Sequence, residues 1–323
     1  MKFVFRTDVH LADKGPVSWK GDYLGELWSS LTQVADIARD LGACAVLDGG
    51  DLFHVKAPTK NSHALVAETV RLHRDVYPCP TYSVVGNHDI SYNNHDSLVR
   101  QSLGVVFASG AIKPLTSVVF EEHGKRVRVV GVPFIPDRTL DSLLAIQKQP
   151  GDDFLVAIVH ALASEEPPPS VLDFFGEPVF RYRDLVTPQG PDVFAFGHWH
   201  KDQGITELEG KVFVNPGSLS RGSLSFETLT RTPQAVIFDF SGDKPIVTLS
   251  PLVVAPAEDV FNFEAKANKE KETRRVTEFL ETLQANLARG TGKASVTDTL
   301  KGLPVPHRVL LETQRYLEMF GVG

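Results

Sequence analysis

Short apolar runs that end in an acid, an amide or an imidazole recur along this chain, and they constrain its fold more than any other feature. Such groups follow runs of strand length at five places: Asp8-Val9-His10, Gly50-Asp51, Gly86-Asn87-His88-Asp89, His160 and Gly197-His198-Trp199-His200. The runs are rich in β-branched residues and predict buried strands. Because ligands bind outside the carboxyl ends of the strands in an open α/β sheet, the five strand ends predict one shared site.

Segments with helical spacing separate the first strands. Leu27, Leu31, Val34 and Ala38 fall on one face of residues 26–41, and Gly42 is a stop signal. Residues 59–76 repeat the pattern. Because strands alternate with helices, the sequence predicts an α/β fold.

Seven of the side chains at the strand ends are candidate metal ligands: Asp8, His10, Asp51, Asn87, His160, His198 and His200. In Asp8-x-His10 and His198-x-His200 one residue separates the two groups, so an extended backbone would place both on one face. Mixed oxygen and nitrogen donors suit manganese, iron or zinc better than magnesium. Two divalent ions about 3.5–4 Å apart that share a carboxylate need this many ligands, and such centres hydrolyse phosphate esters. The alternative is a structural polar cluster, since Asp-x-His is often a polar pair and Gly-Asn-His-Asp is often a turn.

The bulk properties limit the function classes. A formal net charge of −7 argues against simple electrostatic binding of nucleic acid, although bound cations would attract phosphates to an acidic protein. No apolar segment approaches the length of a membrane span. The N-terminal strand carries functional residues within its first ten positions, which predicts a chain without a cleavable signal and a cytoplasmic protein.

The order Asp-x-His, Gly-Asp, Gly-Asn-His-Asp, His, Gly-His-x-His over residues 8–200 resembles the calcineurin-like metallophosphoesterases. The resemblance implies an α/β, four-layer αββα sandwich of two mixed sheets. It also implies that Asp51 bridges two metals, of which one is held by Asp8, His10 and His200 and the other by Asn87, His160 and His198. His88 would face the phosphate, with Asp89 orienting or charging it. Apolar runs at 235–240 and 246–249 are expected to form a hairpin that completes the second sheet.

The stretch Gly50-Asp51-Leu52-Phe53-His54 is similar to that of the SbcD-type DNA-repair nucleases, and differs from the Tyr/Phe-Val-Asp-Arg-Gly run of the phosphoprotein phosphatases. In the SbcD-type enzymes the histidine three residues past the bridging Asp assists catalysis, and this implies a catalytic role for His54. The alternative is that His54 only orients Asp51. The opening Asp8-Val9-His10-Leu11-Ala12, residues 104–110 and the Asn215-Pro216-Gly217-Ser218 turn point the same way with less specificity.

We therefore expect a manganese-dependent DNA exonuclease or endonuclease subunit of DNA repair or recombination. Lys56, Lys201 and Arg221 could contact a DNA backbone, or they could be solvated surface charges. One alternative is a small-molecule phosphodiesterase or phosphatase of the same fold. Another is a non-catalytic binding scaffold, which the complete ligand set disfavours.

We expect two parts in the chain: a nuclease domain over residues 1–255 and a short C-terminal helical segment over 256–323. Apolar stripes predict helices that end near residue 290 and span 308–320. These helices would either pack on the parent domain or dock a partner. The resemblance implies an SbcC-type coiled-coil ATPase as that partner and a homodimer, with residues 97–103 as one candidate dimer contact.

Overall fold

The computed structural model describes residues 1–167, 176–222 and 230–264, together with Asn268, Lys271 and Arg274. Met1–Phe261 forms one compact unit and Asn262–Gly323 a second. The helices expected up to residue 290 and over 308–320 lie outside the described residues. The domain boundary expected after residue 255 stays a prediction.

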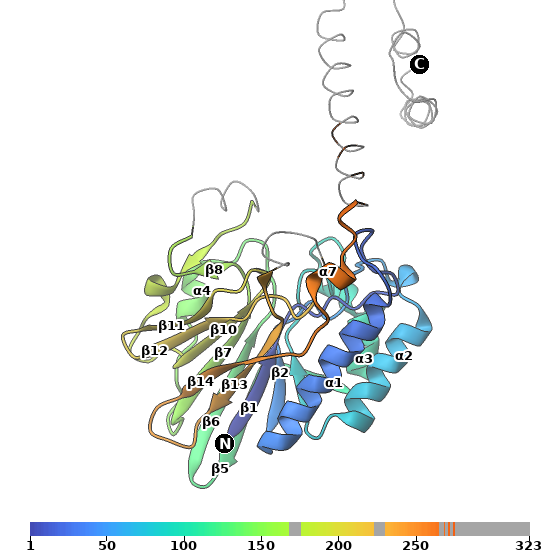
Figure 1. Cartoon of the computed structure of the whole chain (residues 1–323). Coiled ribbons are helices and arrows are strands. Elements are labelled where there is room, and N and C mark those ends of the chain that lie inside the picture. Colours follow the sequence, from blue (N-terminus) through green and yellow to red (C-terminus); the bar gives the residue numbers. More distant parts are fainter. Residues whose placement is uncertain (168–175, 223–229, 265–267, 269–270, 272–273, 275–323) are drawn as a thin grey trace, which may run out of the picture. The chain divides into compact units, whose positions relative to one another are not determined.

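The first unit is built on two six-stranded mixed sheets (Figure 1). In the first sheet β1 pairs in parallel with β2, β2 with β3 and β3 with β4, whereas β13 lies antiparallel to β1 and to β14. Its order is β14 (Ile246–Pro251), β13 (Gln234–Asp239), β1 (Lys2–Arg6), β2 (Ala45–Asp48), β3 (Thr81–Ser83) and β4 (Ile112–Pro114).

The second sheet has a parallel centre and antiparallel edges. β12, β10, β7 and β6 run parallel, and β11 and β5 each pair antiparallel with the strand beside them. Its order is β11 (Gly204–Leu208), β12 (Lys211–Asn215), β10 (Val193–Gly197), β7 (Phe154–His160), β6 (Lys125–Val132) and β5 (Ser117–Glu122). A small separate sheet pairs β8 (Ala163–Ser164) with β9 (Phe180–Arg181).

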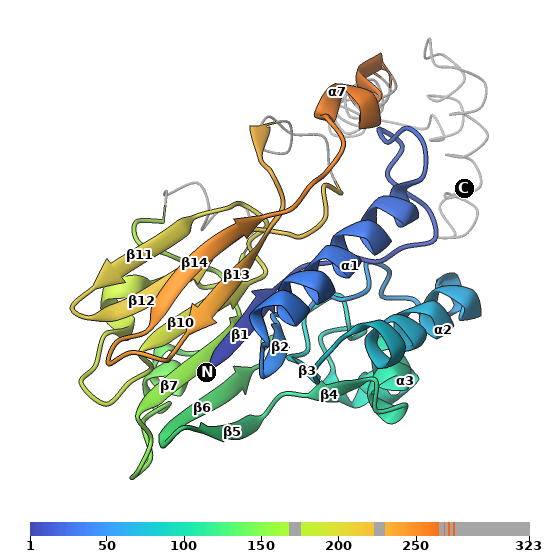
Figure 2. The same cartoon turned by 60° about the horizontal axis from the view of Figure 1, so that its bottom comes forward.

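Helices cover the outer faces, and Figure 2 shows the three longest α-helices together beside the first sheet. The α-helices are α1 (Tyr23–Leu41), α2 (His63–Arg71), α3 (Ser102–Ala108), α4 (Leu140–Leu144) and α7 (Ala257–Val260). Shorter helical turns are η1 (Pro58–Lys60), η2 (Leu72–Val76, a π-helix), η3 (His95–Arg100) and η4 (Tyr182–Leu185). Within the part of the chain that the structure describes, no helix has the length and apolar composition needed to cross a membrane.

Three apolar layers hold the sheets and helices together, and alternation along the strands assigns each side chain to its layer. Phe3 and Phe5 of β1 face the second sheet in the central core, whereas Val4 between them packs with α1 residues on the other side. On the far face of the second sheet, Phe194 packs with Leu143 of α4. The four-layer αββα arrangement of two mixed sheets is therefore confirmed.

The hairpin of β13 and β14 differs from the expectation. It joins the first sheet, not the second, because β13 pairs with β1 from Lys2↔Asp239 to Phe5↔Val236. The buried N-terminal strand has β2 on one side only, and the hairpin satisfies the hydrogen-bonding groups on its other side.

A buried polar network lies at the last residues of β1 and β2. The Arg6 guanidinium pairs with Asp48 on the neighbouring strand (Nε to Oδ2, 2.7 Å), and both side chains are fully buried. Arg6 also donates to the Nε2 of His73 at 2.7 Å and to the Tyr77 hydroxyl. Asp48 Oδ1 accepts from the Gly50 N–H at 3.0 Å, so the network supports the turn that carries Asp51.

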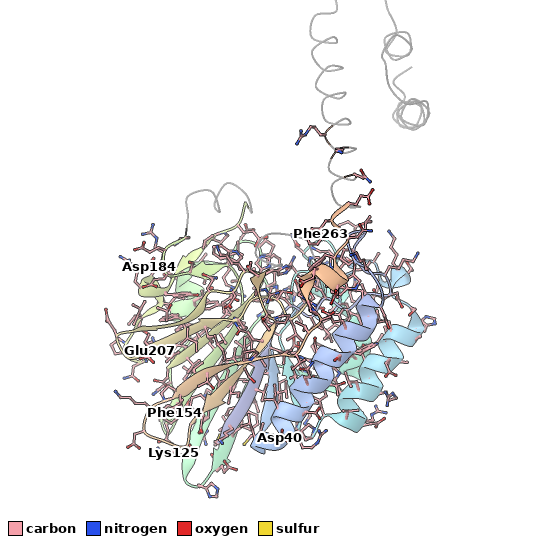
Figure 3. The ribbon with its side chains drawn as sticks, in the orientation of Figure 1. Asp40, Lys125, Phe154, Asp184, Glu207 and Phe263 are labelled. Atoms are coloured by element: carbon pink, nitrogen blue, oxygen red, sulfur yellow. The ribbon has the colours of Figure 1, made fainter. Side chains whose placement is uncertain are left out.

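The strand directions place the polar strand ends together. Lys125 and Phe154, labelled in Figure 3, begin the parallel strands β6 and β7 and lie at the lower end of the molecule in that view. β7 ends at His160, at the opposite end of the strand from Phe154. Candidate ligands that follow β1, β2, β7 and β10 therefore share one edge.

Candidate metal centre

Among the described residues, three groups of potential ligands form at this edge; one contains His10, His54 and His88, and the other two share one carboxylate. Of these two, the first contains Asp8, His10, Asp51 and His200, and the second contains Asp51, His160 and His198. In each group one ligand atom per residue lies within 4.8 Å of all the others. Asn87 adjoins the second group, since its Oδ1 lies 3.1 Å from His160 Nε2. The structure thus brings all seven predicted ligands together, with Asp51 between two sets.

The backbone at four of the seven ligands is left-handed, whereas an extended backbone was expected for the two x-spaced pairs. The φ angles are 53° for Asp8, 53° for His10, 55° for Asp51 and 89° for His198. Aspartate and histidine tolerate this region better than most residues, but each still carries some strain. The side chains of each pair converge because the chain turns just past the strand.

Gly50 gives Asp51 its position. Its φ is 97°, and a Cβ there would lie 2.8 Å from His160 Nδ1 and 2.9 Å from the Gly86 nitrogen. Only glycine meets both demands. The turn after β2 can therefore approach the histidine at the end of β7 closely.

Asp51 has the properties of a bridging ligand. Its Oδ1 accepts from the His88 N–H at 2.7 Å, whereas the buried Oδ2 has no hydrogen-bond partner among the described residues. Oδ2 lies 3.8 Å from His10 Nε2 and 3.5 Å from His160 Nε2. Burial alone would raise the pKa of Asp51, but the positive charge of the nearby His160 outweighs it and lowers that pKa. A buried anionic oxygen without a donor fits a cation.

His10 and His160 direct ring nitrogens toward Asp51. His160 Nδ1 donates to the Gly49 carbonyl at 2.6 Å, which leaves Nε2 facing Asp51 and Asn87. Burial would lower the pKa of His160, yet the Asp51 carboxylate raises it to about 9. For His10, burial and the neighbouring His200 hold the pKa well below 6.5. The donor set of carboxylates, amide and imidazoles fits two divalent transition-metal ions.

His54 and His88 lie beside the first ligand group. Their rings stack at 5.3 Å, and His88 Nδ1 donates to the His54 carbonyl at 2.6 Å. His54 Nδ1 lies 3.4 Å from His10 Nδ1. Burial and the charge of His88 lower the pKa of His54, so its ring is neutral near pH 7. Both imidazoles are near enough to serve a phosphate at the centre.

Asp89 does not orient His88 as expected. Its carboxylate is buried and accepts from the backbone N–H groups of Asp51 and Gly86, each at 2.9 Å. Burial and the charge of Asp51 raise its pKa well above the usual value. Because the two carboxylates belong to adjacent loops, Asp89 supports the loop of Asp51, and the His54 carbonyl orients His88.

The three cations suggested for DNA contact lie in different environments. Arg221 is buried, with Nη2 2.5 Å from Glu26 Oε1 and its guanidinium over the Trp19 ring at 5.6 Å. It is therefore a structural residue and not an exposed cation. Lys56 is half-buried and Lys201 is exposed at the rim.

The Asn215-Pro216-Gly217-Ser218 turn packs beneath Asp8. The Ser218 hydroxyl donates to the Asp8 carbonyl at 2.7 Å, and Asn215 Nδ2 donates to the Trp199 carbonyl at 3.1 Å. These bonds connect the turn to the loops of both x-spaced pairs. They give it a supporting role at the site.

A cavity of about 310 Å³ opens beside the first ligand group. His10, His54 and His200 line it together with the cationic side chains of Lys14, Lys201 and Arg231. Lys14 was not predicted from the sequence, although it lies only four residues after His10, and Arg231 had no signal there. Glu177, whose Oε2 lies 2.9 Å from Nε2 of His198, was not predicted either.

Comparison with known families agrees with this geometry. The calcineurin-like phosphoesterase model matches residues 1–202, and the chain belongs to this family of metal-dependent hydrolases. Its fold uses a dinuclear divalent metal site, for which the seven ligands above are the candidates.

Two archaeal proteins are curated relatives of this chain. The chain is 26% identical over 241 residues to the DNA double-strand break repair protein Mre11 of Archaeoglobus fulgidus, covering 69% of this chain and 51% of that protein. It is 24% identical over 242 residues to the Mre11 of Saccharolobus solfataricus, covering 72% and 58%. The chain thus spans little more than half the length of these relatives. Among solved structures, calcineurin-like phosphoesterase YfkN of Bacillus subtilis is 13% identical, with a TM-score of 0.48, over 87% of this chain and 98% of that chain.

Proposed function

We propose that this protein is a metal-dependent DNA nuclease that hydrolyses phosphodiester bonds in DNA repair or recombination, with Mn²⁺ as its metal. The observation that carries the proposal is the cavity beside His10 and His54. Its volume of about 310 Å³ suits a nucleotide-sized group, and Lys14, Lys201 and Arg231 line it. These cations would bind backbone phosphates although the whole chain carries a net charge of −7.

The chain's own residues have defined parts in this reaction. When bound, the two cations would supply Lewis-acid stabilisation of the phosphoryl oxygens. Asp51 would hold both, with Asp8, His10 and His200 on one and Asn87, His160 and His198 on the other. His88 Nδ1 is engaged by the His54 carbonyl, so Nε2 is the nitrogen that can donate to the phosphate or to the leaving oxygen. The neutral ring of His54 can exchange a proton nearby.

A small phosphodiester or monoester is the second candidate, because a cavity of this volume also fits a single nucleotide. The partners also belong to the proposal. The relatives are named as double-strand break repair proteins, and the resemblance to SbcD-type nucleases suggests an SbcC-type ATPase and a homodimer.

The test is a substrate panel with purified protein and Mn²⁺. Linear duplex DNA, single-stranded DNA, a bis-aryl phosphodiester and an aryl monoester would be assayed in parallel, with EDTA as the blank. We expect cleavage of DNA and of the diester, and loss of both in Asp51→Asn. Intact DNA together with a cleaved monoester would contradict the nuclease and favour the small-molecule enzyme.

The cavity has its own matched test. Lys14→Ala with Lys201→Ala should raise KM for DNA and leave turnover of the small diester unchanged. Lys244→Ala removes an exposed cation from the turn between β13 and β14 and is the control. Equal KM values for the double variant and the control would show that the cavity does not bind DNA.

A further inference from the structure

Glu177 and His198 form a close ion-pair contact at the edge of the second ligand group. Glu177 Oε2 lies 2.9 Å from His198 Nε2, and the two side chains are 28% and 9% exposed. Glu177 precedes β9 and is distant from every ligand motif in the sequence. The contact therefore brings a carboxylate to the centre that the family motif does not contain.

The contact accounts for one of the two nitrogens of the imidazole. A histidine that binds a metal offers a lone pair at one nitrogen and carries a proton at the other, which needs an acceptor. For His160 this acceptor is the Gly49 carbonyl. For His198 the acceptor is the carboxylate of Glu177, which engages Nε2. Nδ1 is then the nitrogen left to bind a metal together with Asp51 and His160.

The packing around His198 leaves its ring little freedom. The ring centroids of Phe134 and His160 lie 5.3 Å and 4.9 Å from that of His198. Both rings pack against the imidazole, and its Nε2 end reaches Glu177. Rotation of the ring would break the bond between Nε2 and Glu177. Among the described residues, no second carboxylate contacts Nε2 that could replace it.

A nearby cation does not compete for Glu177. Arg138 and Glu177 line one small crevice. The guanidinium of Arg138, however, donates to the Pro133 carbonyl at 2.6 Å and to Ser142 Oγ at 3.4 Å. Among the described residues, the one charged partner of Glu177 is thus His198.

We propose that Glu177 is a positioning residue for the second metal: its carboxylate fixes the tautomer and ring orientation of His198, so that Nδ1 faces Asp51 and His160. A negatively charged acceptor also makes the lone pair at Nδ1 more basic, which strengthens its bond to a cation. The inference rests on the dinuclear centre of the proposed function and extends it by one residue.

The test measures metal binding and needs no substrate. Mn²⁺ titration calorimetry and electron paramagnetic resonance would compare the full chain with Glu177→Ala and Glu177→Gln. We expect Glu177→Ala to weaken one of the two ions by about 10–100-fold and to leave the other unchanged. The Gln variant should keep most of the affinity, because its amide oxygen still accepts from Nε2. Glu166→Ala is the control, since Glu166 is 82% exposed and its one ion pair within the described part of the chain is with the exposed Arg183.

Three results would overturn the proposal. Unchanged binding in Glu177→Ala would make the contact incidental, and tighter binding would show that Glu177 competes with the metal for His198. Equal losses in the Ala and Gln variants would make the carboxylate a direct ligand. In a His198→Ala background the Glu177→Ala change should have no further effect on affinity.

Stability is measured separately in EDTA, where all variants should unfold within a few degrees of the parent. If Glu177→Ala unfolds early, the Gln variant, which keeps the side-chain volume, decides between positioning and a direct ligand. A protein whose affinity for the second ion depends on Glu177, but which cleaves no DNA, would keep this inference and refute the nuclease.

Discussion

The Asp89 carboxylate accepts a hydrogen bond from the backbone N–H of Asp51 at 2.9 Å, so a residue next to the catalytic candidate His88 holds the candidate bridging ligand instead. The same carboxylate accepts from Gly86 N–H. One buried side chain thus joins the turn after β2 to the Gly-Asn-His-Asp loop. Asp89 therefore holds the backbone of Asp51, the residue that both ligand groups share.

Asp89→Ala should destabilise the protein by about 3 kcal/mol, because it leaves two buried N–H donors without an acceptor. Asp89→Asn keeps one oxygen and should cost less. Urea unfolding in EDTA measures both. Equal stability of Asp89→Ala and the parent would mean that water replaces the carboxylate without loss.

His73 predicts a pH dependence of stability. It is buried, donates from Nδ1 to the Thr69 carbonyl at 2.8 Å, and accepts from Arg6 at Nε2. Burial and the Arg6 charge hold its pKa well below 6.5. The unfolded chain therefore binds the proton first, so this contribution is complete above pH 6.5 and is lost as the pH falls below it.

The slope from His73 should approach about 1.4 kcal/mol per pH unit below 6.5. His73→Gln should lose that slope, although other buried histidines still contribute in both proteins. The free energies of unfolding of the parent and the variant, measured from pH 7.5 to 5.5, give the difference. Parallel curves would show that His73 stays neutral in both states or charges in both.

Divalent cations should stabilise the fold through Asp51. At a Mn²⁺ concentration 100 times the dissociation constant, the gain is about 2.7 kcal/mol for each site. Thermal unfolding with Mn²⁺ and with EDTA should therefore differ in midpoint, and Asp51→Asn should remove most of the difference. A shift that persists in Asp51→Asn would place the binding elsewhere.

His54→Ser separates catalysis from metal binding. If His54 exchanges a proton in the reaction, DNA cleavage should fall by about 10²–10⁴-fold while both ions stay bound. His63→Ser, at the exposed start of α2, is the matched control. Loss of metal together with activity would assign His54 to the support of His10, which it approaches at 3.4 Å.

Arg221 and the cavity lysines should respond differently to salt. The double variant Lys14→Ala, Lys201→Ala should bind duplex DNA with a weaker salt dependence. In EDTA, the slope of the logarithm of the binding constant against the logarithm of the salt concentration should fall by about 2 in magnitude. Arg221→Ala should leave that slope unchanged and destabilise the fold by about 2 kcal/mol, because its partner Glu26 loses a partly buried ion pair. A change of slope in Arg221→Ala would show that Arg221 contacts DNA.

The sequence predicted the parts of this molecule that depend on local order. Strand ends are local features, so the seven ligands and the shared edge follow from runs such as Asp8-Val9-His10. The partner of each side chain is not local. Asp89 adjoins His88 in sequence but contacts the loop of Asp51, and β13 pairs with β1 from the other end of the domain.

Glu177 and Arg231 had no signal at all in the sequence, because neither belongs to a periodic run or to a ligand motif. Arg221 was ambiguous for a different reason. An arginine after a turn looks the same in sequence whether it faces water or packs on Trp19. Only the fold places Glu26 beside it.

Four ligands with positive φ, Asp8, His10, Asp51 and His198, also determine how this protein would evolve in the laboratory. Glycine or asparagine at these positions would relax the backbone, so the residues that hold metal oppose the stability of the empty fold. A population selected for heat resistance in chelator, with no demand for activity, should therefore lose these four side chains early. The same population grown with Mn²⁺ should keep them.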